Sequence, residues 1–389
     1  MNLIIGILLG LVVLVVLVVL HELGHAYAAK RNGVVVEEFG VGFPPAVHSF
    51  KKRTDKILPK GTIISINWLP LGGFVKLKGE HDSDNKKGDY GAASFWGKTQ
   101  ILFAGVAVNW LVAIVIFSLL AVLGMPKALD NQFYIKEDAR ITGGDTLVAA
   151  VSEGLPAQKA GIEAGDKVVS VGGEEIKSIS QISEYSKSNA GKDIEIEISR
   201  DGKTETKTLE VRSNNDDGKG YIGLSAERLG EKFYSTWSAP IVGVGTTVQF
   251  TGATFQGLGD LVSNFFGGLV KQISFSDEVR SEGASELSTA GASVSGPIGI
   301  IGVIFPQAAQ SGITTILFLA AIISLTLACM NSLPIPALDG GRWFLTFIFR
   351  KILRKPLTKE TEENINAIGF LALMILSVLI IVLDILKIF

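Results

Sequence analysis

Four long apolar segments constrain the fold of this chain more than any other feature of its sequence. Residues 3–20 are apolar apart from two glycines, and residues 101–124, 313–330 and 368–386 are nearly as hydrophobic. A helix rises about 1.5 Å per residue, so each segment is long enough to cross a hydrocarbon layer roughly 30 Å thick. The sequence therefore predicts a polytopic α-helical membrane protein with about four transmembrane helices.

The first segment shares its hydrophobicity with a secretory signal but lacks the other features of one. No basic residue precedes it, and a helical motif with two histidines follows it in place of a small-residue cleavage site. We therefore expect residues 1–30 to remain in the protein as the first transmembrane helix.

Basic residues are distributed unevenly among the segments that connect the apolar runs. Residues 30–100 contain twelve Lys or Arg and seven acids, and residues 341–366 contain six and three. Residues 126–310 contain seventeen basic and twenty-five acidic residues. Because short loops rich in Lys and Arg stay in the cytoplasm, we expect the first two segments there and the third outside. The apolar segments lead us to expect the lipid bilayer as a partner. The basic residues form no stripe interleaved with aromatic residues, so we expect no nucleic acid as a partner.

The connecting segments differ in pattern. Residues 62–67 alternate like a strand, residues 68–73 supply a turn and residues 74–77 read as a return strand, which predicts a β-hairpin on the cytoplasmic side. The predicted organisation is residues 1–30, first transmembrane helix; 31–99, cytoplasmic β-hairpin and loop; 100–125, second transmembrane helix; 126–227, a small extracytoplasmic α+β domain; 228–310, extracytoplasmic amphipathic segment and loop; 311–335, third transmembrane helix; 336–366, cytoplasmic loop; and 367–389, fourth transmembrane helix.

Residues 236–273 are moderately apolar and rich in Gly, Thr and Ser. They suit either a fifth span or an amphipathic helix lying on the outer membrane surface. We favour the surface helix, because a fifth crossing would contradict the charge distribution. Residues 274–296 are small, polar and Ser-rich, and we expect a mobile loop there.

A histidine pair lies at the end of the first apolar run, in the motif His21-Glu22-Leu23-Gly24-His25. On a helix the two imidazoles stand one turn apart on the same face, where both can bind one zinc ion. Glu22 can then take a proton from a water that the zinc has acidified. Ionisable groups beside an apolar run are costly unless they are functional. The motif predicts one Zn²⁺ bound by His21 and His25 with Glu22 as base; the alternative is a chance match.

A catalytic zinc requires a third protein ligand, and the candidate is Asp339. It ends a segment that follows the third apolar run and contains Pro334 and Pro336. Two prolines so close together break a helix, and membranes tolerate such backbone only inside protein or around a watery cavity. The alternative is a plain loop in which Asp339 is solvated.

Together these motifs resemble the site-2 protease family of intramembrane zinc metalloproteases, and most closely its bacterial regulator-of-sigma-E protease branch. The similarity runs along almost the whole chain. It includes the His-Glu-x-x-His helix, Leu-Asp-Gly at 338–340, Pro-Leu-Gly-Gly-Phe at 70–74, Asn-x-x-Pro-x-Pro at 331–336 and Ser-Gly-Pro at 295–297. The resemblance implies an endopeptidase with His21, His25 and Asp339 as zinc ligands and Glu22 as catalytic base.

The resemblance also implies how a substrate helix, once locally unwound, would be held. The hairpin, with Gly72 and Gly73 in its turn, would offer an edge strand, and Asn331 and Pro334 would hold the substrate from the other side. An ordinary membrane-surface ribbon is the alternative for the hairpin. Residues 105–109 lack the proline of the family's Gly-Pro-x-x-Asn motif. Asn109 is therefore expected either to contact hairpin or substrate or to form a plain interhelical hydrogen bond.

Residues 126–227 resemble a PDZ domain of the permuted bacterial form. Its carboxylate-binding loop would be Gly220-Tyr221-Ile222-Gly223-Leu224, whose backbone N–H groups would capture a peptide C-terminus while the peptide adds as a strand. The alternative is a domain that only restricts access. Members of this branch often carry two tandem PDZ domains, and this chain has room for one.

The resemblance places the chain in the bacterial inner (plasma) membrane, with the active site towards the cytoplasm and the PDZ-like domain outside. Its substrates would be single-span membrane proteins already trimmed by another protease, as in the second cut of an anti-sigma factor, or leftover signal peptides. A non-catalytic adaptor with structural zinc is a competing reading, but such a site needs four ligands and the sequence offers three. A zinc transporter would need ligands along a path, whereas these cluster at one depth.

Overall fold

The computed structural model describes residues 2–388 apart from 54, 56, 130, 177–178, 216–217, 275, 293–295 and 356. The chain forms two compact units. The helical unit comprises Met1–Leu123, Phe133–Ile135 and Thr236–Phe389, and the β-rich unit comprises Gly124–Gln132 and Lys136–Ser235.

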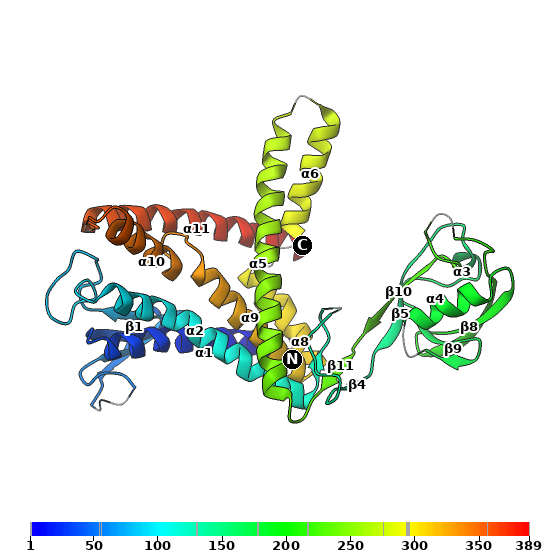
Figure 1. Cartoon of the computed structure of the whole chain (residues 1–389), viewed down its shortest axis with the longest axis horizontal. Coiled ribbons are helices and arrows are strands. Elements are labelled where there is room, and N and C mark those ends of the chain that lie inside the picture. The colour runs from blue at the N-terminus through cyan, green and yellow to red at the C-terminus, as the bar shows by residue number, and fades with distance from the viewer. Residues whose placement is uncertain are drawn as a thin grey trace. The chain divides into compact units, whose positions relative to one another are not determined.

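Four helices of the described residues are long and apolar enough to cross a membrane, as the sequence predicts. They are α1 (Asn2–Arg31), α2 (Phe95–Leu123), α9 (Ile313–Ser332) and α11 (Lys359–Ile388) (Figure 1). Helices α1 and α2 approach closely at Gly24, where an added Cβ would lie 2.7 Å from the Ala104 carbonyl oxygen. Small residues allow such backbone contact between membrane helices. The close approach brings the histidine motif of α1 against α2.

The two strands predicted to pair as a hairpin are arranged differently in the structure. Strands β1 (Val36–Lys51) and β2 (Ile63–Leu77) are long and bent, and both halves of β2 pair with the first half of β1. Val41 lies opposite Gly73 and also opposite Ile66. Residues 62–67 and 74–77 are thus separated by β1, and the prediction that they pair directly as a hairpin is wrong. Glycine and proline residues at 40–45 let β1 bend, so that it pairs with both halves of β2. This pairing depends on tertiary contacts, and the local alternation of residues does not encode it.

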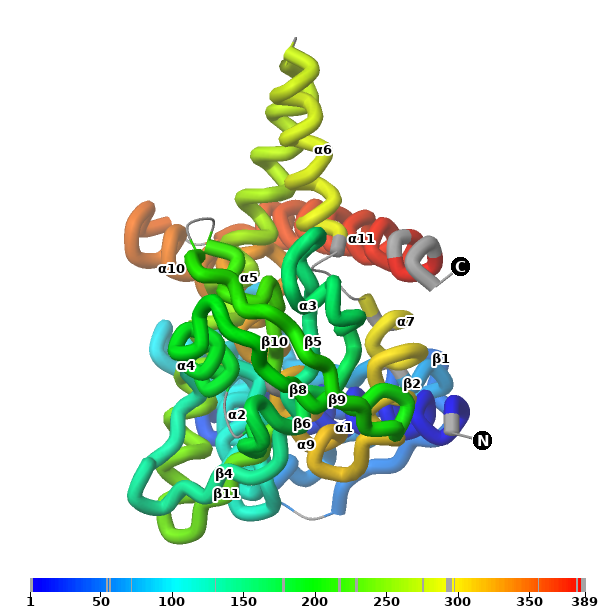
Figure 2. The backbone as a smooth tube through the Cα atoms, turned by 90° about the vertical axis from the view of Figure 1, so that its right-hand side faces the viewer, coloured from blue at the N-terminus to red at the C-terminus, as the bar shows by residue number. Residues whose placement is uncertain are grey.

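One segment predicted as a mobile loop is largely helical. Helix α5 (Ala239–Gln272) is followed by α6 (Asp277–Ala292) within the predicted mobile loop 274–296. The two form a hairpin, visible in both Figure 1 and Figure 2, in which Lys271 lies 2.8 Å from Glu286 and Gly268 packs against Gly283. Packing on α5 thus stabilises a polar sequence that would not hold a helix alone. Figure 1 shows α5 running steeply across α2.

The chain returns to α9 through a second helical segment made of α7 (Pro297–Gly299), the π-helix η1 (Ile300–Ile304) and α8 (Phe305–Ser311). Backbone N–H groups of Gly296 and Gly299 donate to the carboxylate of Asp384 on α11, at 3.0 and 2.8 Å. Asp384 therefore caps this segment. The neighbouring Ser295 lies outside the described residues.

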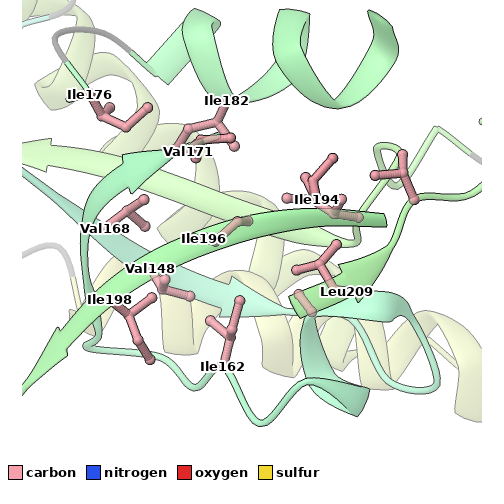
Figure 3. Packing of buried hydrophobic residues seen from close by; sticks show 13 residues of the cluster. Val148, Ile162, Val168, Val171, Ile176, Ile182, Ile194, Ile196, Ile198 and Leu209 are labelled. Carbon is pink, nitrogen blue, oxygen red and sulfur yellow. The ribbon is translucent and has the colours of Figure 1, made fainter. Parts of the chain in front are cut away.

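The β-rich unit is built on a sheet of order β10-β5-β6-β8-β9, with β7 paired to β6. Along β8, Ile194, Ile196 and Ile198 point into the core while the intervening residues point outwards (Figure 3). The unit ends at Ser235, eight residues beyond the predicted boundary at 227, because strand β11 adds to a second small sheet of order β3-β11-β4. Its elements are β3 (Met125–Pro126), β4 (Arg140–Thr142), β5 (Asp145–Val151), α3 (Pro156–Lys159), β6 (Lys167–Val171), β7 (Glu174–Glu175), α4 (Ile179–Ser188), β8 (Asp193–Arg200), β9 (Lys203–Glu210), β10 (Leu224–Leu229) and β11 (Lys232–Tyr234).

Candidate metal centre

Helix α1 carries His21 and His25 on one face, one turn apart, and both are buried. Their Nε2 atoms lie 3.0 Å from each other. The rings meet edge to face, with centroids 4.7 Å apart. The helical spacing of the motif therefore brings the two nitrogens to one point, as the sequence predicts.

Asp339 reaches the same point from a part of the chain far away in sequence. Its Oδ2 atom lies 3.2 Å from Nε2 of each histidine. Asp339 is the first residue of helix α10 (Asp339–Phe347), which the π-helix η2 (Ile348–Ile352) extends, so part of the predicted cytoplasmic loop 336–366 is helical. Gly340 and Gly341 let this helix start directly against the proline segment, because a Cβ on either would overlap carbonyl oxygens of residues 332–335.

The three converging atoms fit a zinc ion. His25 Nδ1 lies 2.7 Å from the carbonyl oxygen of Ile101, which can only accept, so Nδ1 carries the proton and Nε2 presents a lone pair. Two imidazole lone pairs and a carboxylate directed at one another repel unless a cation lies between them. Ligand atoms at about 2.05 Å from a tetrahedral zinc are separated by about 3.3 Å. The observed separations of 3.0–3.2 Å are close to that value.

Helix α2 completes the surroundings of the histidines with Asn109, a candidate of the sequence analysis, and with two residues that the sequence analysis did not assign to the site. Ile101, Gly105 and Asn109 lie four residues apart, on one stripe of α2. Ile101 binds His25 as described, and Asn109 Nδ2 lies 3.3 Å from His21 Nδ1. A Cβ on Gly105 would lie 2.5 Å from His25 Nε2, so only glycine leaves room for the histidines there. The four-residue spacing of Gly105 and Asn109 was the available signal.

Strand β2 approaches Glu22. The backbone of Val75 lies near the Glu22 carboxylate. A Cβ on Gly73 would lie 3.6 Å from Glu22 Cγ and 3.0 Å from the Gly40 carbonyl oxygen. Gly72 and Gly73 of β2 thus allow the second half of this strand to lie against Glu22, the predicted base. The local sequence pattern did not indicate that Val75 would also lie near Glu22.

A buried ionic cluster holds α10 in place. The carboxylate of Asp82, which is fully buried, accepts hydrogen bonds from Lys98 of α2 and, at 2.9 Å to each oxygen, from Nε of Arg350 in η2. In addition, Trp343 Nε1 donates to Thr99 Oγ1 at 2.9 Å. These contacts join the loop before α2, the start of α2 and the helix that carries Asp339. They are a reason why Asp339 can be held at a fixed position.

Three other residues named in the sequence analysis lie on or beside these elements. Asn331 is half-buried near the end of α9, Pro334 is exposed, and Gly72 lies against the ring of Phe43. Neither Asn331 nor Pro334 makes a side-chain hydrogen bond to any described residue.

In the β-rich unit, the predicted carboxylate-binding loop directs its carbonyls inward. The carbonyl oxygens of Tyr221, Ile222 and Gly223 accept from Arg212, Ala157 and Ser152. Within the described part of the chain, no partner is found for the N–H groups of these three loop residues. A cavity of about 610 Å³ in this unit is lined instead by residues between 154 and 160 and between 208 and 214.

Comparison with known proteins identifies the family. Residues 9–376 match the model of peptidase family M50. A putative zinc metalloprotease of Clostridium perfringens is 32% identical over 369 residues, which cover 95% of each chain. The regulator of sigma-W protease RasP of Bacillus subtilis is 26% identical over an alignment of 457 positions that covers 96% of each chain. A PDZ domain of an SdrC-like protein from Listeria monocytogenes is similar at 23% identity and a TM-score of 0.20, over 22% of this chain and 92% of its own. The chain therefore belongs to peptidase family M50, the site-2 protease family of zinc metalloproteases.

Proposed function

We propose that the chain is an intramembrane zinc endopeptidase that hydrolyses peptide bonds in or beside transmembrane segments of membrane proteins. His21, His25 and Asp339 hold the zinc, and Glu22 is the catalytic base. The observation that carries the proposal is the convergence of three lone-pair atoms within 3.2 Å of one another, on elements joined to four apolar helices.

The chain's own residues supply the proton transfer. When bound, zinc lowers the pKa of a water molecule and polarises the scissile carbonyl. Glu22 accepts the proton of that water and passes it to the leaving amine. The β2 backbone at Gly73 and Val75 lies beside the Glu22 side chain and supports its orientation for this task.

Substrate binding by strand addition is supported by the position of β2 beside Glu22. A transmembrane helix has all its backbone groups bonded internally, so its peptide bonds are shielded until it unwinds. The unwound segment would then pair with the edge of β2 near Gly73 and Val75. Asn331 and Pro334 remain our candidates for holding the other side of the segment, and Gly72 belongs with Gly73 to the β2 side.

The remaining parts of the proposal concern placement and partners. Large apolar side chains remain exposed along α11, as lipid-facing positions require; they include Ile368, Phe370, Leu371, Ile375, Val378 and Leu379. We assign the chain to a bacterial inner membrane, with the metal centre towards the cytoplasm and the β-rich unit, a PDZ-like domain, outside. The N–H groups of Tyr221, Ile222 and Gly223 have no partner among the described residues, which supports capture of a peptide C-terminus, with the edge of β10 for the added strand. The substrates are single-span proteins that another protease has trimmed, such as anti-sigma factors, or leftover signal peptides.

The test is cleavage of a tagged single-span substrate by the purified full chain in detergent. Wild type, Glu22→Gln and His21→Ala are compared, with zinc content measured for each. We expect cleavage by wild type only, with zinc retained by Glu22→Gln and lost by His21→Ala. Running the substrate with and without its outer part tests the requirement for trimming.

Cleavage by Glu22→Gln at the wild-type rate would reject the mechanism. Retention of stoichiometric zinc by His21→Ala would reject the ligand assignment. Equal cleavage of the trimmed and untrimmed substrates would remove the requirement for an earlier protease but leave the peptidase assignment intact.

A further inference from the structure

Each histidine of the metal centre has a second ring nitrogen, and helix α2 meets both of them. His25 Nδ1 donates to the carbonyl oxygen of Ile101 at 2.7 Å. His21 Nδ1 lies 3.3 Å from the side-chain amide of Asn109, two helical turns further along the same stripe of α2. A metal-binding histidine nearly always donates its other ring N–H to such an acceptor, which orients the ring and raises the basicity of the ligand nitrogen. The two contacts therefore have the geometry of matched supports for a metal site.

The amide of Asn109 has an oxygen available for this purpose. In the structure Nδ2 faces His21, and Oδ1 is buried without a hydrogen-bond partner among the described residues. A half-turn of the amide exchanges the two atoms without moving the rest of the side chain. For His21 Nε2 to present its lone pair to a metal, neutral His21 must carry its proton on Nδ1, and an N–H cannot point at the amide N–H₂. The loaded centre thus requires Oδ1 towards His21.

The backbone of Asn109 is fixed independently of its side chain. Its carbonyl oxygen accepts from Ser324 Oγ of α9 at 2.9 Å, and both residues are fully buried. Asn109 thereby joins α2 to α9, the helix that leads to Asp339, while its side chain touches His21 of α1. Asn109 therefore lies where α1, α2 and α9 meet.

We propose that Asn109 is a positioning residue of the metal centre: its Oδ1 accepts a hydrogen bond from Nδ1–H of His21 and so holds the tautomer whose Nε2 binds zinc. This role replaces substrate contact as our assignment for Asn109. It rests on the proposed ligand set and makes Asn109 the side-chain counterpart of the Ile101 carbonyl.

The test measures zinc affinity, which does not depend on turnover. The full chain is purified in detergent, stripped of metal and titrated with Zn²⁺ against a chromophoric chelator. Asn109→Leu keeps the approximate shape and removes the acceptor, and we expect about a 10–100-fold weaker affinity. Asn109→Asp keeps an acceptor oxygen and should bind at least as tightly as wild type. Ser324→Ala loosens the α2–α9 contact without removing the acceptor, so its affinity should stay near that of wild type.

Two further readouts separate this inference from its alternatives. Melting temperatures of the metal-free variants report packing alone, and the absorption spectrum of Co²⁺-loaded protein reports ligand geometry. Should Asn109→Leu fail to fold, Asn109→Ala takes its place with the same expected weakening. Wild-type affinity in Asn109→Leu, or equal losses in Asn109→Leu and Asn109→Asp, would overturn the positioning role. Undiminished zinc binding by His21→Ala would instead show that the ligand assignment itself is wrong.

Discussion

Replacing Gly105 by alanine tests whether α2 truly forms the wall of the metal centre. The added Cβ would lie 2.5 Å from His25 Nε2 and 2.7 Å from His21 Cε1, whereas ordinary contact begins at 3.4 Å. The His25 ring must therefore retreat by about 0.9 Å, but its hydrogen bond to Ile101 holds it. Zinc–ligand distances tolerate only about 0.2 Å of error. We expect Gly105→Ala to weaken zinc binding at least as much as a lost supporting contact, about 10–100-fold, with a parallel loss of cleavage.

The assay is the same competition titration with Zn²⁺, accompanied by cleavage of a single-span substrate. Gly252→Ala on α5 is the matched control, because an added Cβ there meets nothing within 4 Å. That control should keep wild-type affinity and gain about 0.5–1 kcal/mol of helix stability. Wild-type zinc affinity and activity in Gly105→Ala would refute the close packing of α2 on the histidines.

Three further outcomes are expected. Asp82→Asn leaves the cations of Lys98 and Arg350 without their buried carboxylate. We expect the free energy of unfolding to fall by about 3–5 kcal/mol, seen as a lower melting temperature in detergent. Asp84→Asn, at a partly exposed position, is the control, and equal melting temperatures of the two variants would contradict the role of the cluster. The hydrogen bonds from Arg200 hold the pKa of Asp166 below its usual value, so their contribution to the stability of the β-rich unit is present above about pH 4 and is lost as pH falls through the native pKa. Denaturant titrations below pH 4 should therefore show a shallower decline for Asp166→Asn than for wild type, and an equal decline would count against the ion pair. Treatment with 1,10-phenanthroline should abolish cleavage, and added Zn²⁺ but not Mg²⁺ should restore it, because imidazole ligands suit zinc; recovery with Mg²⁺ would exclude the proposed centre.

Some features of the site follow from local sequence alone. The spacing of His21 and His25 ensures that any helix through residues 21–25 presents both imidazoles on one face. Their position at the end of an apolar run predicts a functional role for them, because such groups are costly in a membrane. Asp339 was proposed on weaker grounds, from the proline-broken segment that precedes it and from the resemblance to a family motif. The local pattern around it indicated a loop, although Asp339 begins a helix.

Other elements depend on contacts with distant segments of the chain, which local sequence patterns do not identify. The strands at 62–67 and 74–77 look like a hairpin, but β1 lies between them because its bent first half pairs with both. The polar residues of α6 suit a loop when read alone, and become helical against α5. In each case the deciding contacts come from another segment of the chain.

The amino-acid sequence by itself determined the four apolar helices, the imidazole pair on one helical face and the acidic residue available as base. Only the tertiary structure brought Asp339, 318 residues from His21, to the two histidines and placed Ile101, Gly105 and Asn109 of α2 around them. The physical reason is the distance along the chain over which each effect acts. Periodicity acts over a few residues and is written in the local sequence, whereas the meeting of distant segments depends on packing summed over many weak contacts, none of which a single residue specifies.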